Sequence, residues 1–311
     1  MHRRHLLRAA VAAVAGTAVA PSRAASPQSR PAAPLGRHGH YVRTRDGESL
    51  FFKDWGGGDP VVFLAGWGLP SDMWDYQMVP LSEAGLRCLA YDRRGHGRSS
   101  QPGGGYEYDT LSDDLATVLE TLDLRRVTLV GMSMAGGEIV RYLTRHGSTR
   151  IARVMFVGTA ATPFVARTAD NPNGIPPERL ESFRKHVLLR DYPKWLEDNR
   201  QPFFVPETST QLQEWIRMLM LGNSMKALIE CHRAMTSTDF RAELPKLVVP
   251  TLVVHGDRDV SAPLQLTGDP TARMIPGARL KVYEDAPHGL FLTHMERLTA
   301  DIRRFARPSA A

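Results

Sequence analysis

The most constraining feature of the sequence is a serine that lies between an apolar run and a helical one. Residues 126–130 read Arg-Val-Thr-Leu-Val, residues 131–135 read Gly-Met-Ser-Met-Ala, and residues 138–143 have a helical pattern. A strand that turns sharply into a helix strains the residue at the turn, so only small side chains fit two positions to either side. The glycine and the alanine meet this requirement. The segment therefore predicts a strand, a nucleophile elbow at Ser133 and a helix.

An elbow serine needs a base and an acid, and both are expected at the ends of later strands. The apolar run at 251–256 ends before Asp257 and Asp259, and the run at 279–284 ends before His288. Because a serine hydroxyl is a poor nucleophile near neutral pH, we predict that His288 is its base and that a carboxylate orients the imidazole. We assign the carboxylate to Asp259, at the far end of its turn, with Asp257 as the alternative.

Acyl transfer also needs N–H groups that stabilise the oxyanion of the tetrahedral intermediate. One is expected from Met134, the residue after the nucleophile. The second is expected from Trp67, in a Gly-Trp-Gly loop after the apolar run at 60–65. A tryptophan merely buried against a sheet is the alternative interpretation.

Apolar runs that alternate with helical patterns predict an α/β fold, with a mostly parallel central sheet and helices on both faces. From about residue 162 to 247 helical patterns recur without a strand, which predicts an inserted helical cap over the carboxyl ends of the strands. Phe164, Trp215 and Leu290 are the expected pocket side chains. The predicted strands lie near 41–45, 49–55, 60–65, 87–91, 126–132, 151–158, 251–256 and 279–284.

The N-terminus has a different character. Arg3 and Arg4 precede an alanine-rich apolar run at 9–20 and a small-residue site near 22–24, which is typical of a twin-arginine export signal. The run is too short for a bilayer span, so we predict export to the periplasm or the extracellular medium, with no stable membrane anchor after cleavage. The predicted segments are a signal peptide at 1–24, a linker at 25–40 and an enzymatic domain at 41–308.

Charge and cysteine content argue against other classes. The chain has 39 Lys and Arg against 33 Asp and Glu, and loss of the four arginines of residues 1–24 lowers the net charge from +6 to +2, which argues against a nucleic-acid partner. Cys88 and Cys231 suit buried thiols better than a disulfide. No histidine has the spacing of a metal site, and no glycine-rich segment has the lysine of a phosphate loop. We therefore predict no metal and no other cofactor.

Together these residues resemble the α/β-hydrolases, and within them the cofactor-free (non-haem) haloperoxidases, aryl esterases and perhydrolases. The resemblance covers roughly residues 40–307. It implies that Ser133, Asp259 and His288 are the catalytic triad and that Trp67 and Met134 supply the oxyanion amides. It rests on further motifs: Phe52-Lys53-Asp54-Trp55, Trp74-Asp75-Tyr76-Gln77-Met78, Tyr91-Asp92-Arg93-Arg94-Gly95-His96-Gly97-Arg98-Ser99-Ser100, Gly137-Glu138, Arg141-Tyr142, Arg145-His146-Gly147 and Ala286-Pro287-His288-Gly289-Leu290.

The sequence departs from the family pattern at three positions. Ala65 replaces the usual histidine before Gly-Trp, which bears on the rigidity of the oxyanion loop more than on mechanism. Ala135 replaces the usual second glycine of the elbow. Gly68 stands where haloperoxidase-like and perhydrolase-like members often carry proline, which lowers the expected peracid chemistry. The loop at 92–99 we interpret as a folded connection with no catalytic role.

The leading hypothesis is therefore an exported serine hydrolase that cleaves small aryl or short-chain alkyl esters through an acyl-enzyme, with weak perhydrolase or haloperoxidase side activity. A lactonase or a carbon–carbon bond hydrolase with the same triad is the second hypothesis. A non-catalytic ligand-binding relative that keeps the fold is the third. The expected partner is a small-molecule ester, and a homo-oligomer is compatible with the sequence.

Overall fold

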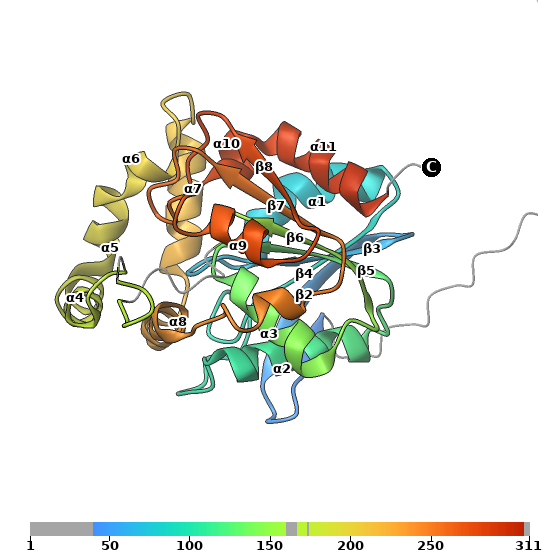
Figure 1. The fold of residues 1–311 in the computed structure, drawn as a ribbon, viewed down its shortest axis with the longest axis horizontal. Helices are drawn as coiled ribbons and strands as arrows, with labels where there is room; N and C mark the ends of the chain where they lie inside the picture. Colours follow the sequence, from blue (N-terminus) through green and yellow to red (C-terminus); the bar gives the residue numbers. More distant parts are fainter. Residues whose placement is uncertain (1–39, 160–166, 173, 308–311) are drawn as a thin grey trace, which may run out of the picture. The chain divides into compact units, whose positions relative to one another are not determined.

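The computed structural model describes residues 40–159, 167–172 and 174–307, which form an eight-stranded sheet with helices packed around it (Figure 1). The strand order is β1-β2-β4-β3-β5-β6-β7-β8. The pairs β1–β2 and β2–β4 are antiparallel and all the others are parallel, so the predicted sheet is confirmed. The strands are β1 (Tyr41–Arg43), β2 (Ser49–Gly56), β3 (Pro60–Leu64), β4 (Arg87–Tyr91), β5 (Val127–Met132), β6 (Ile151–Val157), β7 (Thr251–Gly256) and β8 (Arg279–Tyr283).

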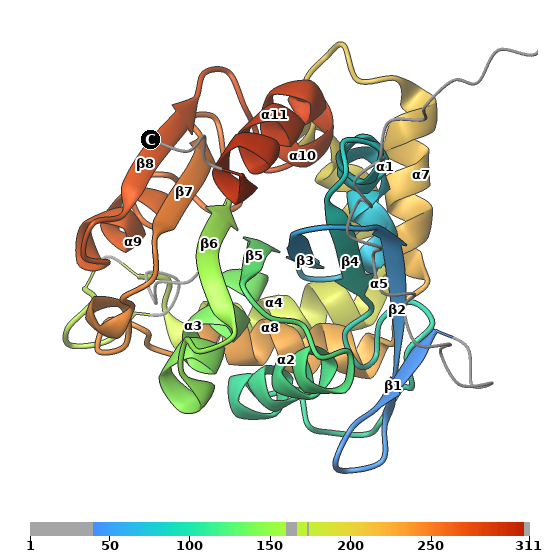
Figure 2. The same ribbon diagram turned by 90° about the vertical axis from the view of Figure 1, so that its right-hand side faces the viewer.

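Helices cover both faces of this sheet. Figure 2 shows α1, α10 and α11 on one side of the strands and α2 and α3 on the other. Short 3-10 turns at Ser71–Trp74 and Leu244–Lys246 join some of the elements. The helices of the two faces are α1 (Asp75–Glu83), α2 (Tyr108–Thr121), α3 (Ala135–His146), α9 (Gly268–Met274), α10 (Leu290–Thr293) and α11 (Met295–Ala306).

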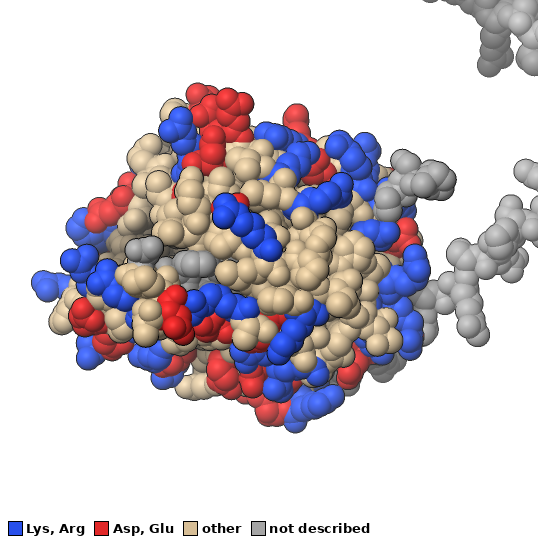
Figure 3. Space-filling model, in the orientation of Figure 1, with Lys and Arg blue, Asp and Glu red and all other residues tan. Residues whose placement is uncertain are grey.

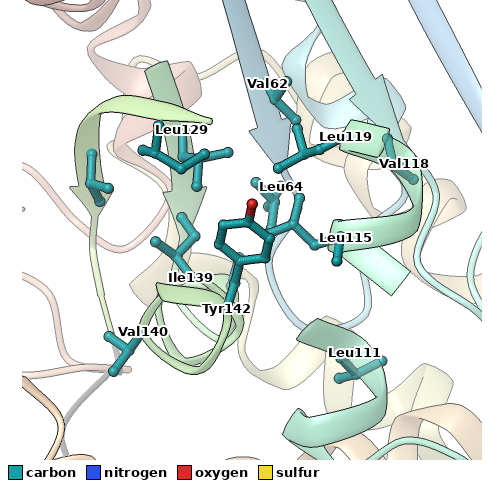
Figure 4. Packing of buried hydrophobic residues seen from close by; sticks show 14 of the residues in the cluster. Val62, Leu64, Leu111, Leu115, Val118, Leu119, Leu129, Ile139, Val140 and Tyr142 are labelled. Atoms are coloured by element: carbon teal, nitrogen blue, oxygen red, sulfur yellow. The ribbon is translucent and has the colours of Figure 1, made fainter. Parts of the chain in front are cut away.

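Two apolar clusters hold the layers together because successive strand residues point to opposite faces. In β3, Val62 and Leu64 belong to the cluster under α2 and α3, whereas Val61 and Phe63 belong to the cluster under α1 and α11. Figure 4 shows side chains of the first cluster, including Leu64 of β3, Leu115 of α2 and Tyr142 of α3. Burying each such large apolar side chain contributes about 1.5–3 kcal/mol to the free energy of unfolding. Central strands that are buried on both faces read as continuous apolar runs, which is why their positions could be predicted.

The segment between β6 and β7 is helical, as the fold class predicted, and its helices lie together beyond the strand ends (Figure 1). Ser209 and Ser224 cap the longest two helices by accepting hydrogen bonds from Leu212 N and Ala227 N. A separate small cluster around Leu188 and other cap side chains holds these helices together. The helices are α4 (Pro177–Phe183), a π-helical turn (Arg184–Leu188), α5 (Leu189–Asp198), α6 (Arg200–Phe203), α7 (Thr210–Leu221) and α8 (Met225–Ser237).

Several predictions of the sequence concern residues outside the described ranges. The predicted signal peptide and most of the predicted linker lie there, as does Phe164. Within the described part of the chain, no helix combines the length and the apolar character needed to cross a bilayer. On the face seen in Figure 3, basic and acidic side chains are interspersed around uncharged surface. Cys88 and Cys231 are both buried and free.

Candidate active site

The candidate nucleophile, Ser133, occupies a strained turn between β5 and α3. Its φ is +52°, in the left-handed region that is costly for a residue with a side chain. Its N–H donates to Val157 O at 2.9 Å, which ties the turn to the end of β6. At Gly131, an added Cβ would lie 2.6 Å from Ile139 Cδ1, so the steric reason for a small residue at this position is visible. Ser133 itself is 7% exposed.

The candidate acid and base are paired on neighbouring loops. His288 Nδ1 lies 2.7 Å from Asp259 Oδ2, and both side chains are buried. The other carboxylate oxygen, Oδ1, accepts a hydrogen bond from Ala262 N at 2.7 Å. His255 Nε2 lies 3.4 Å from Asp259 Oδ2. Asp257 is exposed and makes no side-chain hydrogen bond within the described residues, so the structure brings His288 to Asp259 and not to the alternative aspartate.

The electrostatics of this pair favour an ionised carboxylate. Burial of Asp259 opposes ionisation, but the charge of His288 and hydrogen bonds from His255 and His288 outweigh it and hold the pKa of Asp259 well below its usual range. A carboxylate only accepts hydrogen bonds, so His288 Nδ1 carries the proton that joins the two residues. In neutral His288 the other nitrogen, Nε2, is then unprotonated and able to take a proton.

A glycine that the sequence analysis did not single out connects the serine to this pair. Gly158 directly follows β6 and has a φ of +51°. An added Cβ there would lie 3.5 Å from both Asp259 Oδ2 and His288 Nδ1. Since Ser133 N is bonded to Val157 O, the end of β6 adjoins the serine and the acid–base pair. The three candidate catalytic side chains therefore follow β5, β7 and β8, and the end of β6 lies between the serine and the acid–base pair.

The loop after β3 lies next to the serine, as expected for an oxyanion site. An added Cβ on Gly66 would be 3.7 Å from Ser133 Cβ. Leu69 N donates to Gly66 O at 3.3 Å, and Gly68 has a φ of +70°, which a type II turn requires at its third position. No backbone or side-chain acceptor in the described part of the chain receives the N–H of Trp67 or of Met134. Both N–H groups are therefore unpaired within the described residues.

The ring of Trp67 packs against the cap cluster as well as against the apolar cluster of the sheet. Its Nε1 donates to Leu228 O of α8 at 2.8 Å. The rings of Tyr192, Trp195 and His232 surround it edge-on, with centroid separations of 6.3, 5.7 and 5.8 Å. The alternative interpretation, in which this tryptophan is merely buried against the sheet, is incomplete, because the ring also contacts the cap.

Two of the predicted pocket side chains, Trp215 and Leu290, lie in the apolar cluster under α1 and α11. The ring of Trp215 packs edge-on against that of Tyr76, with the ring centroids 5.6 Å apart. Leu290 is fully buried at the start of α10. The cap residue that reaches the acid–base pair is Phe203, whose ring lies 5.8 Å from that of His288. Its contact depends on the path of the chain through α6, for which the sequence carries no signal. The pocket assignments of Phe164, Trp215 and Leu290 stay predictions.

The remaining buried histidines have structural environments. His255, inside β7, is fully buried, and its Nε2 lies 2.7 Å from Ala262 O. Burial and the charge of Arg93 lower the pKa of His96 to about 3, so that side chain is neutral at ordinary pH. Across residues 40–159, 167–172 and 174–307, no group of three or more His, Cys, Asp or Glu side chains is placed to hold a metal ion.

A strained serine after a parallel strand, a buried acid–base pair and two N–H groups with no acceptor among the described residues are typical of the site of an α/β-type hydrolase. The sequence model of the alpha/beta hydrolase fold family matches residues 59–295. The chain belongs to this family.

Proteins named as esterases and as non-heme haloperoxidases are similar to this chain. A non-heme chloroperoxidase from Kitasatospora aureofaciens is 39% identical over 84% of this chain and 97% of its own length. A bifunctional esterase/perhydrolase from Acinetobacter calcoaceticus is 34% identical over 86% of this chain and 99% of its own. Among solved structures, an esterase from Exiguobacterium antarcticum has a TM-score of 0.82 and 33% identity, covering 86% of this chain and 99% of the esterase. The resemblance that the motifs indicated is confirmed.

Proposed function

We propose that this protein is a serine carboxylic-ester hydrolase that acts on small aryl or short-chain alkyl esters through an acyl-enzyme. The observation that carries the proposal is a strained, buried Ser133 in the same site as the pair of His288 and Asp259. In that pair, His288 Nδ1 lies 2.7 Å from Asp259 Oδ2. The esterase and esterase/perhydrolase relatives support the reaction class. The substrate range rests on the sequence resemblance.

In the proposed mechanism, Ser133 Oγ attacks the ester carbonyl carbon while His288 Nε2 takes the hydroxyl proton. The carbonyl oxygen becomes an oxyanion, which the N–H groups of Trp67 and Met134 stabilise. Collapse of the tetrahedral intermediate breaks the bond to the alcohol oxygen, and His288 returns the proton to the leaving alcohol. Water then repeats the sequence on the acyl-enzyme. Asp259 stays ionised and stabilises the imidazolium throughout.

The test is pre-steady-state turnover of a series of p-nitrophenyl esters that differ in acyl length. An acyl-enzyme whose hydrolysis is slow gives a burst of nitrophenol equal to the enzyme concentration. We expect the burst and the highest kcat/KM with short acyl chains. Turnover of lactones or carbon–carbon substrates with no ester hydrolysis would contradict the proposal and favour the second hypothesis.

A weak perhydrolase activity at the same site is part of the proposal, because a relative is named as an esterase/perhydrolase. Hydrogen peroxide would replace water as the nucleophile on the acyl-enzyme, and the released peracid would oxidise halide in solution. Gly68, with its φ of +70°, has a backbone conformation that proline cannot adopt, which supports a slow reaction. Bromination should require a carboxylic acid and resist chelators. Bromination in carboxylate-free buffer would contradict this route.

We also propose export through the twin-arginine signal. The support is the sequence alone: Arg3 and Arg4 before an alanine-rich run and a small-residue site. Mass spectrometry of protein recovered outside the cytoplasm should show a chain that lacks roughly the first 24 residues. Replacing both arginines by lysine should leave the precursor inside the cell, and unchanged export of that variant would contradict the proposal.

A further inference from the structure

A buried arginine lies beneath the loop that carries Trp67. Arg93 follows β4 in the loop at 92–99 and is 3% exposed. Its Nη2 donates to Ala65 O at 2.6 Å and its Nη1 lies 3.3 Å from Gly66 O. Its Nε donates to Glu138 Oε1 at 2.7 Å. Glu138 is also buried and belongs to the first turn of α3, the helix that follows the elbow. One guanidinium therefore links the oxyanion loop to the nucleophile helix.

The contact to Gly66 O acts on the same peptide unit that carries the Trp67 N–H. This peptide is planar and trans, since the described chain contains no cis bond. Its carbonyl and its N–H therefore point in opposite directions. With the carbonyl held by Arg93 on one side, the N–H is directed away from the guanidinium. A hydrogen bond from a cation to the carbonyl also polarises the peptide, which makes the N–H a stronger donor.

A purely structural role does not account for this arrangement well. Burying an ion pair is costly, and an apolar pair of similar volume often gives equal or greater stability. Leu69 N also donates to Gly66 O, at 3.3 Å, so the turn already has its own backbone bond. Burial favours the neutral guanidine, but the charge of Glu138 outweighs burial and raises the pKa of Arg93. The side chain is therefore a permanent cation directed at two loop carbonyls.

We propose that Arg93 is a positioning residue of the oxyanion site, which orients and polarises the Gly66–Trp67 peptide so that the Trp67 N–H is a stronger donor to the oxyanion. The methyl side chain of Ala65 cannot form a hydrogen bond that fixes the loop. The guanidinium of Arg93 instead fixes it through the carbonyl oxygens of Ala65 and Gly66. The inference rests on the proposed ester hydrolysis. It assigns a role to the 92–99 loop, which the sequence alone indicated only as a folded connection.

The test compares Arg93→Met with Arg94→Met. Arg94 is the adjacent residue and is equally buried, but its donors go to Asp114 and Asp46 and not to the oxyanion loop. The probes are an aryl ester and an aryl trifluoromethyl ketone, which adds to the serine hydroxyl and forms a hemiketal oxyanion. Thermal unfolding and circular dichroism establish that each variant is folded.

We expect Arg93→Met to lower kcat/KM by about 10²-fold, near the loss of one oxyanion donor, with KM within about threefold of wild type. The inhibition constant of the trifluoromethyl ketone should rise by a similar factor, because that ligand also needs the oxyanion donors. Arg94→Met should leave the ketone affinity within about threefold. A merely structural role would change both variants alike.

Arg93→Lys provides a second measurement if the methionine variant does not fold. Lysine keeps the positive charge, but its ammonium group cannot donate to two carbonyls and a carboxylate in the planar geometry of a guanidinium. The affinity for the ketone should therefore lie between those of wild type and Arg93→Met. A folded Arg93 variant that binds the ketone as tightly as wild type would overturn the inference while leaving ester hydrolysis intact. Equal losses in both arginine variants would also overturn it. A wild-type protein that neither hydrolyses the ester nor binds the ketone would contradict the proposed function itself.

Discussion

The strand ends that carry the candidate triad and the helical cap above them differ sharply in burial. All six residues of β7 are buried, as are all six of β5. In α7 of the cap, Ile216 is the buried residue among twelve, and Met218 is 56% exposed. Parallel strands fix their residues through ladders of hydrogen bonds and two apolar clusters, whereas the cap helices add only some of their side chains to those clusters and form a smaller one of their own. The sheet is therefore suited to hold reacting atoms, and the cap to vary around them.

The largest effect is expected at the sheet. Replacing Ser133 by alanine removes the proposed nucleophile, and kcat for a p-nitrophenyl ester should fall by about 10⁶-fold, because triad members act as a unit. The free energy of unfolding should change little, because alanine keeps the Cβ and the backbone conformation. Steady-state kinetics together with denaturant unfolding measure both quantities. Activity within tenfold of wild type would exclude Ser133 as the nucleophile.

Two aspartates on one loop provide the next test. Asp259→Asn leaves His288 Nδ1 without its carboxylate and should lower kcat by about 10⁴-fold, since the imidazole loses its fixed tautomer. Asp257→Asn is the matched control on the exposed side of the same loop and should lower kcat by less than about threefold. The same ester kinetics measure both variants. The reverse ranking would transfer the acid role to Asp257.

Particular residues explain why the sheet could be predicted and the cap only in part. Val127–Met132 is an apolar run because both faces of its strand are buried, and the elbow follows from local sterics at Gly131. The contacts of Phe203 with His288 and of Arg93 with Gly66 join residues far apart in the sequence. Helical periodicity shows that Trp215 is on an apolar face but not which neighbour it meets. Such contacts depend on tertiary packing, so no local pattern predicts them.

The cap contains a buried histidine that should make its stability depend on pH, as buried His96 should for the loop after β4. His232 in α8 packs against Phe183 and Trp67, and Arg184 Nη1 donates to its Nδ1 at 3.1 Å. Burial and the charges of Arg184 and Arg233 lower its pKa to about 4. In the unfolded chain its pKa is about 6.5. The unfolded state therefore binds this proton more tightly, and stability is full above pH 6.5 and is lost as the pH falls to about 4.

Protonation of His232 should lower the free energy of unfolding by about 3 kcal/mol between pH 6.5 and pH 4. The difference between wild type and a His232 variant in denaturant unfolding at pH 7 and at pH 4 should show it, and hydrogen exchange in α8 should rise on acidification. The His232→Asn variant keeps an acceptor for Arg184 without a titrating ring, so its stability should depend less on pH over this range. An unchanged pH slope in that variant would show that the histidine does not govern the acid response.

The smallest effect is expected at Gly68, where the two regions meet. Its φ is +70°, and an added Cβ would lie 3.2 Å from Leu228, Met220 and Tyr192 of the cap. Gly277 is a matched control, because its φ is +71° and nothing lies within 4 Å of an added Cβ. Each alanine variant should lose about 1 kcal/mol of unfolding free energy through the backbone strain.

The difference between the two alanine variants measures how firmly the cap is held against the oxyanion loop. If the cap is rigid, Gly68→Ala should be the less stable of the two by a further ~1 kcal/mol, because the tight contacts cannot relax. If the cap side chains can move away from the added methyl group, the two variants should have equal midpoints of urea unfolding. The substrate preference of Gly68→Ala should then shift instead. A Gly68→Ala variant more stable than Gly277→Ala would contradict the close approach of the cap to this loop.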